Sequence, residues 1–135
     1  MRVRGPENLR AYGVLMRAGR VLISAEHLGG RDILKFPGGG VEPDETPEQG
    51  LIREFQEECS IVVRPVRLLH VPGTLLSPWT QRNYTPVYYL VEGEGEIRTP
   101  PHEPVAMLFL APEEAIESGR MAEPEKLALR RACAR

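Results

Sequence analysis

The sequence predicts an α/β fold in which a mixed β-sheet lies between helices. Two observations support this prediction. Short apolar runs rich in β-branched and aromatic residues alternate with segments of helical periodicity, and prolines stand at the starts of the periodic segments. A chain of 135 residues is long enough for one domain with a substantial core. We therefore expect residues 1–135 to form a single domain.

Three strands are expected before the first helix. Tyr12–Met16 and Val21–Ala25 flank Arg17–Arg20, whose glycine favours a hairpin turn. Ile33–Phe36 is a third, short strand. It leads into a run of three glycines, Gly38–Gly40, which we expect to form a turn.

The strongest local signal is a helix from about Pro47 to Cys59. Thr46 suits the N-cap, Pro47 suits the first helical position, and Gln49 completes a capping box. Apolar side chains then recur at spacings of three, four and seven, so they form a stripe that can pack into a core. The stripe consists of Leu51, Ile52, Phe55 and Cys59.

The remaining elements continue the alternation. The last expected strand is a continuous apolar run, which is typical of a buried strand. One of the two expected helices is stopped by a glycine, and the other begins at a proline. In order, the expected elements are strands at Ile61–Val71, Pro86–Val91 and Val105–Leu110, then helices at Pro112–Ser118 and Pro124–Ala134.

Three acids share one side of the first helix, away from the apolar stripe. Glu54, Glu57 and Glu58 stand at positions i, i+3 and i+4. Neighbouring carboxylates repel one another, and acids near a helix C-terminus also oppose the macrodipole. A divalent cation with oxygen ligands, such as Mg²⁺, would relieve both effects. The alternative is a solvated acidic face with ion pairs to Arg53 or another base.

The glycine run offers a second feature of the same region. Gly38, Gly39 and Gly40 permit positive φ angles and a close approach of the backbone to a phosphate or a metal. The alternative is an ordinary connection between a strand and a loop. The segment is not a P-loop, because no Gly-Lys-Ser/Thr follows.

Taken in register, these residues resemble the signature of the Nudix hydrolases, and the flanking residues are similar to the MutT type. The matching positions are Gly39, Glu45, Arg53, Glu54, Phe55, Glu57, Glu58 and Ile61, with Ser60 where the signature has its final glycine. The resemblance implies an α/β/α sandwich with a central mixed β-sheet. It also implies hydrolysis of a diphosphate linkage in a nucleotide.

The resemblance assigns expected roles to single residues. Glu54, Glu57, Glu58 and the Gly38 carbonyl match metal-binding positions, for Mg²⁺ or alternatively Mn²⁺. Metal bound there would polarise the diphosphate and lower the pKa of an attacking water. The general base would be Glu57 or Glu54, or else Glu103 in a late loop.

Two further pairs complete the expected site. Arg53 and Glu45 match an ion pair that orients the helix and its loop, and we count both with the catalytic residues. The backbones of Gly39 and Gly40 are expected to face the substrate phosphates.

Two positions depart from what a stable helix prefers. At Ser60, a left-handed C-terminal residue with a Cβ atom costs roughly 1 kcal/mol, unless the helix ends in a different turn. Gly50 inside the helix costs about 1 kcal/mol relative to alanine, or else marks close packing. We expect the departure at Ser60 to weaken local stability and to leave the three acids in place.

The segment Pro72–Thr85 is a long connection. Long ordered connections in compact domains are often functional. Trp79 or Tyr84 could stack on a nucleobase while Arg82 holds a phosphate, so Arg82 and Tyr84 are candidate substrate-binding residues. The alternative is a surface loop anchored by packing of Trp79.

Composition narrows the class of protein. The formal net charge of −2 gives no general attraction to nucleic acid or to an acidic membrane. No apolar run is long enough to span a membrane, and no signal peptide is visible, so we expect a cytoplasmic protein. Cys59 and Cys133 are too few for a disulfide scaffold, and three scattered histidines do not suggest a zinc site. A homodimer is compatible with the resemblance.

The leading functional hypothesis is therefore a Mg²⁺-dependent hydrolase. Its substrate would be a nucleoside diphosphate linked to another group: a nucleoside triphosphate, a nucleotide sugar, ADP-ribose or a dinucleoside polyphosphate. One alternative is a nucleotide-binding regulatory module that does not hydrolyse its ligand. Another is an isomerase of isoprenoid diphosphates, which would need a Cys and a Glu in the pocket, and Cys59 lies on the apolar face of the helix.

Overall fold

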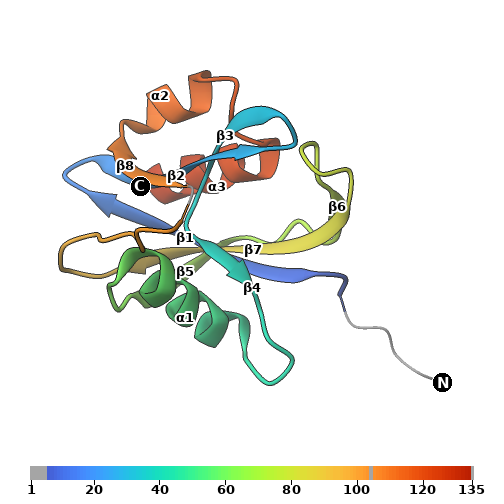
Figure 1. Cartoon of the computed structure of the whole chain (residues 1–135), viewed down its shortest axis with the longest axis horizontal. Helices are drawn as coiled ribbons and strands as arrows, with labels where there is room; N and C mark the ends of the chain where they lie inside the picture. The colour runs from blue at the N-terminus through green and yellow to red at the C-terminus, as the bar shows by residue number, and fades with distance from the viewer. Residues whose placement is uncertain (1–5, 104, 135) are drawn as a thin grey trace.

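The computed structural model describes residues 6–103 and 105–134. A central sheet lies between α1 on one side and α2 with α3 on the other (Figure 1). The predicted α/β/α sandwich is therefore confirmed. In chain order, the elements are β1 (Leu9–Arg17), β2 (Arg20–Leu28), β3 (Arg31–Lys35), β4 (Gly38–Gly40), α1 (Pro47–Cys59), β5 (Arg64–His70), β6 (Leu75–Leu76), β7 (Asn83–Glu92), β8 (Ala106–Leu110), α2 (Pro112–Glu117) and α3 (Glu123–Cys133).

The sheet is mixed, as predicted. Its main path runs β3-β2-β1-β7-β5, and β4, β6 and β8 pair with β1, β7 and β2 respectively. β1 is parallel to β7 over seven residue pairs and antiparallel to β2 and β4. β1 is thus a central strand, and the glycine strand β4 lies directly beside it.

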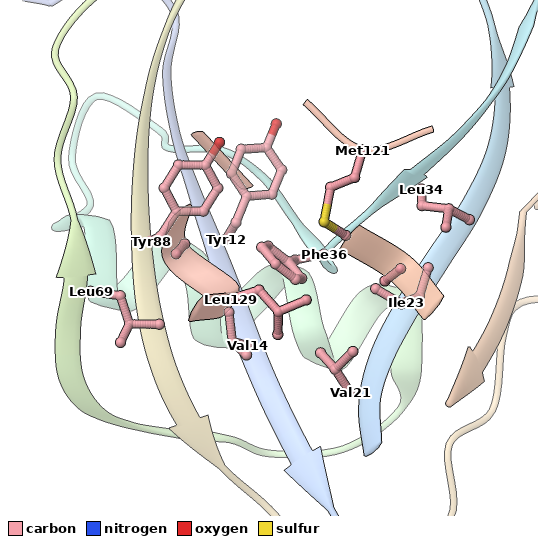
Figure 2. Close-up of a cluster of buried hydrophobic side chains, with 12 residues drawn as sticks. Tyr12, Val14, Val21, Ile23, Leu34, Phe36, Leu69, Tyr88, Met121 and Leu129 are labelled. Carbon is pink, nitrogen blue, oxygen red and sulfur yellow. The ribbon is translucent and has the colours of Figure 1, made fainter. Parts of the chain in front are cut away.

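Alternation along β1 and β7 divides the core into two clusters, because successive side chains of a strand point to opposite faces. One set packs under α1 with Leu51 and Phe55, and it includes Ala11, Leu15, Val87, Tyr89 and Val91. The other set packs under α2 and α3 (Figure 2), and it includes Tyr12, Val14, Tyr88, Ala115, Ala128 and Leu129. Both faces of the sheet are therefore covered by helices.

The first helix forms as the sequence predicts. Thr46 accepts a hydrogen bond from the Gln49 N–H, the Gln49 side chain accepts one from the Thr46 N–H, and the helix spans Pro47–Cys59. Three of the four stripe residues are fully buried: Leu51, Phe55 and Cys59. Ile52 is only partly buried, at the margin of the same cluster.

Two expectations about strands were wrong. Gly38–Gly40 is not a turn but a short strand, because its backbone pairs with Arg10, Ala11 and Tyr12 of β1. The apolar run ending at Leu110 is not a buried strand. β8 pairs with β2 alone in the part of the chain that the structure describes, and its residues are exposed or half-buried.

The long connection before β7 is shorter than expected. β6 pairs with the start of β7, so Tyr84 lies in a strand, and the connection is divided into irregular residues 71–74 before β6 and a loop at 77–82 after it. Ser77 orders this loop: its hydroxyl accepts hydrogen bonds from the N–H groups of Trp79 and Thr80, and its N–H donates to the Arg82 carbonyl. Figure 1 shows the hairpin formed by β6 and β7 beside the turn between β2 and β3. No helix within the described residues is long and apolar enough to cross a lipid bilayer.

Candidate active site

An ion pair between Arg53 and Glu45 ties α1 to the loop that precedes it. Arg53 Nε donates to Glu45 Oε2 at 2.8 Å, and Nη2 donates to Oε1 at 2.9 Å. The same Nη2 donates to the Gly40 carbonyl at 2.9 Å, and the Glu42 N–H donates to Glu45. The bonds from Arg53 and from the Glu42 N–H hold the pKa of Glu45 at about 2. Glu45 is therefore a permanent anion that fixes the guanidinium.

The other side of the Arg53 guanidinium faces two of the three acids. Nη1 lies 3.1 Å from Glu54 Oε1 and 3.3 Å from Glu57 Oε1. Arg53 thus donates hydrogen bonds to three carboxylates and one carbonyl at once. Desolvation by burial raises the pKa of Glu54, while the hydrogen bond from Arg53 opposes that rise.

Glu58 points to the glycine strand instead. Its Oε2 accepts a hydrogen bond from the Gly38 N–H at 3.0 Å. Burial raises the pKa of Glu58 to about 8; the Gly38 N–H opposes this, and the nearby Glu54 adds to it. Ionised Glu58 is therefore unfavourable unless a further positive charge approaches.

A Cβ atom would meet close neighbours at two positions of β4. Gly38 has φ +148°, and a Cβ atom there would lie 2.1 Å from the Ala11 carbonyl oxygen. A Cβ atom at Gly39 would lie 2.7 Å from Glu54 Cδ. At Gly40 the same atom would meet nothing within 4 Å. Gly39 therefore lets the Glu54 carboxylate lie against the backbone.

The donor set suits a divalent cation, although it is not gathered around one point. Within residues 6–103 and 105–134, no three Asp, Glu, His or Cys side chains are grouped closely enough to hold a metal ion. Arg53 holds Glu54 and Glu57 on one side, and Gly38 holds Glu58 on the other. All the candidate ligands are oxygens, which Mg²⁺ and Mn²⁺ prefer, and a cation would relieve the two half-buried acids.

A cavity of about 380 Å³ opens near these acids. It contains the predicted Arg82 and Tyr84, together with Trp79. Its walls come from β1, β2, β3, the 77–82 loop, β7 and α3. The lining residues are Asn8, Arg10, Tyr12, Glu26, Leu28, Lys35, Ser77, Trp79, Thr80, Arg82, Tyr84, Tyr88 and Glu125.

Two basic residues join the cavity to the acid face. Arg10 and Lys35 both line the cavity. The Arg10 guanidinium interacts electrostatically with Glu54 and Glu58, and the Lys35 ammonium acts on the carboxyls of both Glu58 and Glu125. Arg10 and Lys35 therefore link the cavity electrostatically to the acids of α1, although none of those three acids lines it.

Sequence reasoning missed several of these residues, and one of its candidates, Glu103, lies apart from the others. Arg10, Glu26, Lys35 and Glu125 lie in strands or in α3 with no local motif, so only their packing brings them together. Glu103 is exposed in a turn closed by its own N–H to the Pro100 carbonyl. No hydrogen bond or ion pair among the described residues joins Glu103 to α1.

An α/β/α sandwich whose acid helix follows a glycine strand defines a class, the Nudix fold. The model of the NUDIX domain matches residues 7–132, and the chain belongs to this family. The predicted resemblance is confirmed.

Sequence relatives match part of the chain. An 8-oxo-dGTP diphosphatase of Proteus vulgaris is 43% identical over 65 residues, which are 48% of this chain and 54% of the relative. An RNA pyrophosphohydrolase of Teredinibacter turnerae is 44% identical over 54 residues, 40% of this chain and 31% of the relative. The chain spans about half or less of the length of these curated relatives.

Solved structures extend the likeness of fold to nearly the whole chain. A MutT Nudix hydrolase from Burkholderia pseudomallei superimposes with a TM-score of 0.76 at 22% identity, covering 95% of this chain and 98% of that one. A UDP-X diphosphatase superimposes with a TM-score of 0.73 at 16% identity, covering 98% of this chain and 64% of that one. At these identities the likeness concerns the fold.

Proposed function

We propose that this chain is a divalent-metal-dependent hydrolase of the diphosphate linkage in a nucleoside diphosphate joined to another group. One observation carries the proposal: a carboxylate helix, braced by Arg53 and Glu45, lies against a glycine strand and beside a cavity lined with aromatic and basic residues. The names of the relatives, which act on 8-oxo-dGTP or RNA, agree with this class of chemistry.

In this proposal the acids of α1 and the Gly38 carbonyl hold the metal. Glu54, Glu57 and Glu58 supply carboxylate oxygens, and Mg²⁺ or Mn²⁺ supplies charge stabilisation for the diphosphate and lowers the pKa of a bound water. Arg53 would give up its contacts with Glu54 and Glu57 while it keeps Glu45 and the Gly40 carbonyl. Glu45 and Arg53 thus act by positioning the helix.

Glu57 is the general base that we favour. Its side chain is 57% exposed, against 17% for Glu54, so it meets water most readily. Glu54 remains the alternative, and Glu103 is a third candidate without a contact to the site. Arg82 and Tyr84 would hold the nucleoside, while the backbones of Gly39 and Gly40 would face the phosphates.

A substrate panel with Mg²⁺ or Mn²⁺ tests the proposal. It contains nucleoside triphosphates, ADP-ribose, nucleotide sugars, dinucleoside polyphosphates and an oligonucleotide with a 5′-triphosphate. We expect metal-dependent release of phosphate or of a nucleoside monophosphate. Glu57→Gln should reduce turnover by at least about a hundredfold, the lower part of the range for general-base removal. Glu114→Gln, which removes an exposed acid from α2, is the matched control.

Two outcomes would overturn the proposal. One is full turnover in EDTA or in Glu57→Gln. The other is tight nucleotide binding without any product, which would favour the regulatory module instead.

A further inference from the structure

Two cations of the cavity wall lie beside one aromatic ring. The Arg10 guanidinium carbon and the Lys35 ammonium each lie 5.7 Å from the centroid of the Tyr12 ring. The ring is fixed, because it is buried and stacks on Tyr88 with centroids 5.6 Å apart. Figure 2 shows both tyrosine hydroxyl groups pointing away from the core cluster that the rings join. Tyr12 therefore brings positive charges from β1 and β3 to one place.

Arg10 has unused hydrogen-bonding capacity. Its Nε donates to the Tyr12 hydroxyl at 2.6 Å, and this bond to a neutral group is the only one that its side chain makes within residues 6–103 and 105–134. A guanidinium has five N–H donors. None of its nitrogens is a buried atom without a partner, so the remaining N–H groups are open to the cavity that Arg10 lines. A half-buried guanidinium of this kind suits an anion with several oxygens, such as a phosphate.

Lys35 also keeps donors for a further partner. In the described part of the chain, its ammonium has one carboxylate at ion-pair distance, Glu26, whose Oε2 lies 3.7 Å from Nζ. That separation is too long for a hydrogen bond, and the same oxygen accepts one from the Ser24 hydroxyl at 3.1 Å. The carboxyl of Glu125 attracts Lys35 as well, from beyond ion-pair distance. The three N–H donors of the ammonium are therefore available to a ligand.

The two cations share a position relative to the acid helix. Arg10 interacts electrostatically with Glu54 and Glu58, and Lys35 interacts with Glu58. Like charges beside one ring repel each other, and an anion bound between them would offset that repulsion. A phosphate held by both cations would lie within electrostatic range of the helix that the proposed hydrolysis uses.

We propose that Arg10 and Lys35 together bind a phosphate group of the substrate, and that Tyr12 is the positioning residue that orients the Arg10 guanidinium. Arg10 binds through the N–H groups that it does not give to Tyr12, and Lys35 binds through its ammonium. The inference rests on the proposed function, since it adds two phosphate-binding residues to the same site. These residues lie outside α1, so they hold the phosphate independently of the acids that would bind a metal.

Inorganic pyrophosphate tests the site without turnover and without a nucleoside. It is titrated calorimetrically into the unmodified chain, in buffer freed of divalent metals, and we expect a dissociation constant below about 1 mM. Arg10→Gln and Lys35→Gln should each weaken binding at least about tenfold, as the loss of a charged hydrogen bond implies. Arg20→Gln is the matched control, because it removes an exposed guanidinium at the far end of the β1–β2 hairpin. It should bind pyrophosphate as the unmodified chain does.

Tyr12→Phe tests the positioning role. The variant keeps the stacked ring and loses the hydroxyl that accepts the hydrogen bond from Arg10. We expect a three- to tenfold loss of pyrophosphate affinity, about the value of one hydrogen bond. In a chain that already carries Arg10→Gln, the same change should have no further effect, because no guanidinium remains to be oriented.

Three results would overturn the inference. The first is an unmodified chain that does not bind pyrophosphate, which decides the matter even if every variant fails to fold. The second is full pyrophosphate affinity in folded Arg10→Gln and Lys35→Gln proteins. The third concerns Tyr12 alone: losses that add up in the double variant would remove its positioning role.

The substrate panel separates this inference from the proposed function. Metal-dependent hydrolysis with an unchanged KM in Arg10→Gln and Lys35→Gln would leave the hydrolase standing and remove the phosphate site. Pyrophosphate binding that both variants weaken, without hydrolysis of any member of the panel, would do the reverse.

Discussion

Arg53 connects the parts of the candidate site at the scale of single residues. Its guanidinium reaches Glu45, the Gly40 carbonyl, Glu54 and Glu57. A lysine could not reproduce this, because an ammonium is a point charge without the planar fork that binds Glu45 through two hydrogen bonds. One side chain thus sets the position of the loop, the glycine strand and the acid face.

Gly39 provides a test of how closely the acid face must approach the backbone. Its added methyl group in Gly39→Ala would displace the Glu54 carboxylate, which is the mobile end of a side chain, so the fold should survive. We expect metal affinity or turnover to fall by about 10- to 100-fold, as for other residues that support metal ligands. Mn²⁺ titration measures the metal affinity, and a thermal melt shows whether the fold survives.

Gly40→Ala is the matched control, because a Cβ atom there meets nothing within 4 Å. It should keep its metal affinity. Equal losses of metal affinity in the two variants would contradict the packing argument.

The two cysteines should react very differently with a thiol reagent. Burial, with a smaller contribution from Glu58, raises the pKa of the Cys59 thiol to about 12, and its side chain is fully buried. Cys133 is exposed. We expect one thiol per folded chain to be modified and two in denaturant. Cys133→Ser should abolish labelling of the folded protein; rapid labelling of that variant would show that Cys59 is accessible.

At the scale of elements, α1 ends as a helix with a C-terminal glycine would end. Ser60 adopts φ 61° and ψ 28°, and its N–H donates to the Gln56 carbonyl. Its hydroxyl donates to the Arg98 carbonyl at 3.0 Å. The side chain thus ties the end of the helix to the segment after β7, which offsets part of the cost of the left-handed conformation.

Substitution of Ser60 separates these two effects. Ser60→Ala keeps the left-handed strain and loses the hydrogen bond, so we expect a loss of about 1 kcal/mol in the free energy of unfolding. Ser60→Gly removes both the strain and the hydrogen bond, so the free energy of unfolding should change by less than about 1 kcal/mol. Urea unfolding measures the difference.

Turnover at saturating metal should be the same in both Ser60 variants, because Ser60 touches none of the three acids. A large rise in turnover in Ser60→Gly would show that the end of the helix also controls the site.

At the scale of the whole molecule, the acid face makes folding stability depend on pH. The pKa of Glu58 is about 8 in the folded chain and near 4.5 when unfolded. A carboxyl whose pKa rises on folding contributes stability that is present below the lower value and is lost as pH rises through the upper value. The metal-free protein should therefore lose stability between about pH 5 and about pH 8.

Urea unfolding in EDTA across this range measures the effect. Glu58→Gln should flatten the dependence, although Glu125, whose pKa burial also raises to about 8, contributes in the same direction. Glu45 does not interfere, since its pKa is about 2. Stability that increased with pH would contradict the assignment. A single unfolding transition would support the prediction of one domain, which the fold alone does not test.

The sequence by itself determined the first helix, its capping box, its buried stripe, its acid stripe and the membership of the Nudix family. These features depend on residues within a few turns of one another, so spacing alone fixes which side chains share a face. The same reasoning placed the glycine run correctly in the chain but gave it the wrong conformation, because pairing with Arg10–Tyr12 is not visible locally.

Only the tertiary structure decided which partners the site residues meet. The contact of Glu58 with Gly38 joins α1 to β4, and the cavity brings Arg10, Lys35, Trp79 and Glu125 together from four separate parts of the chain. No periodicity links such positions. The physical reason is that burial and charge at Glu125 and Glu58 arise from neighbours packed across the sheet, and those neighbours exist only once the strands have paired.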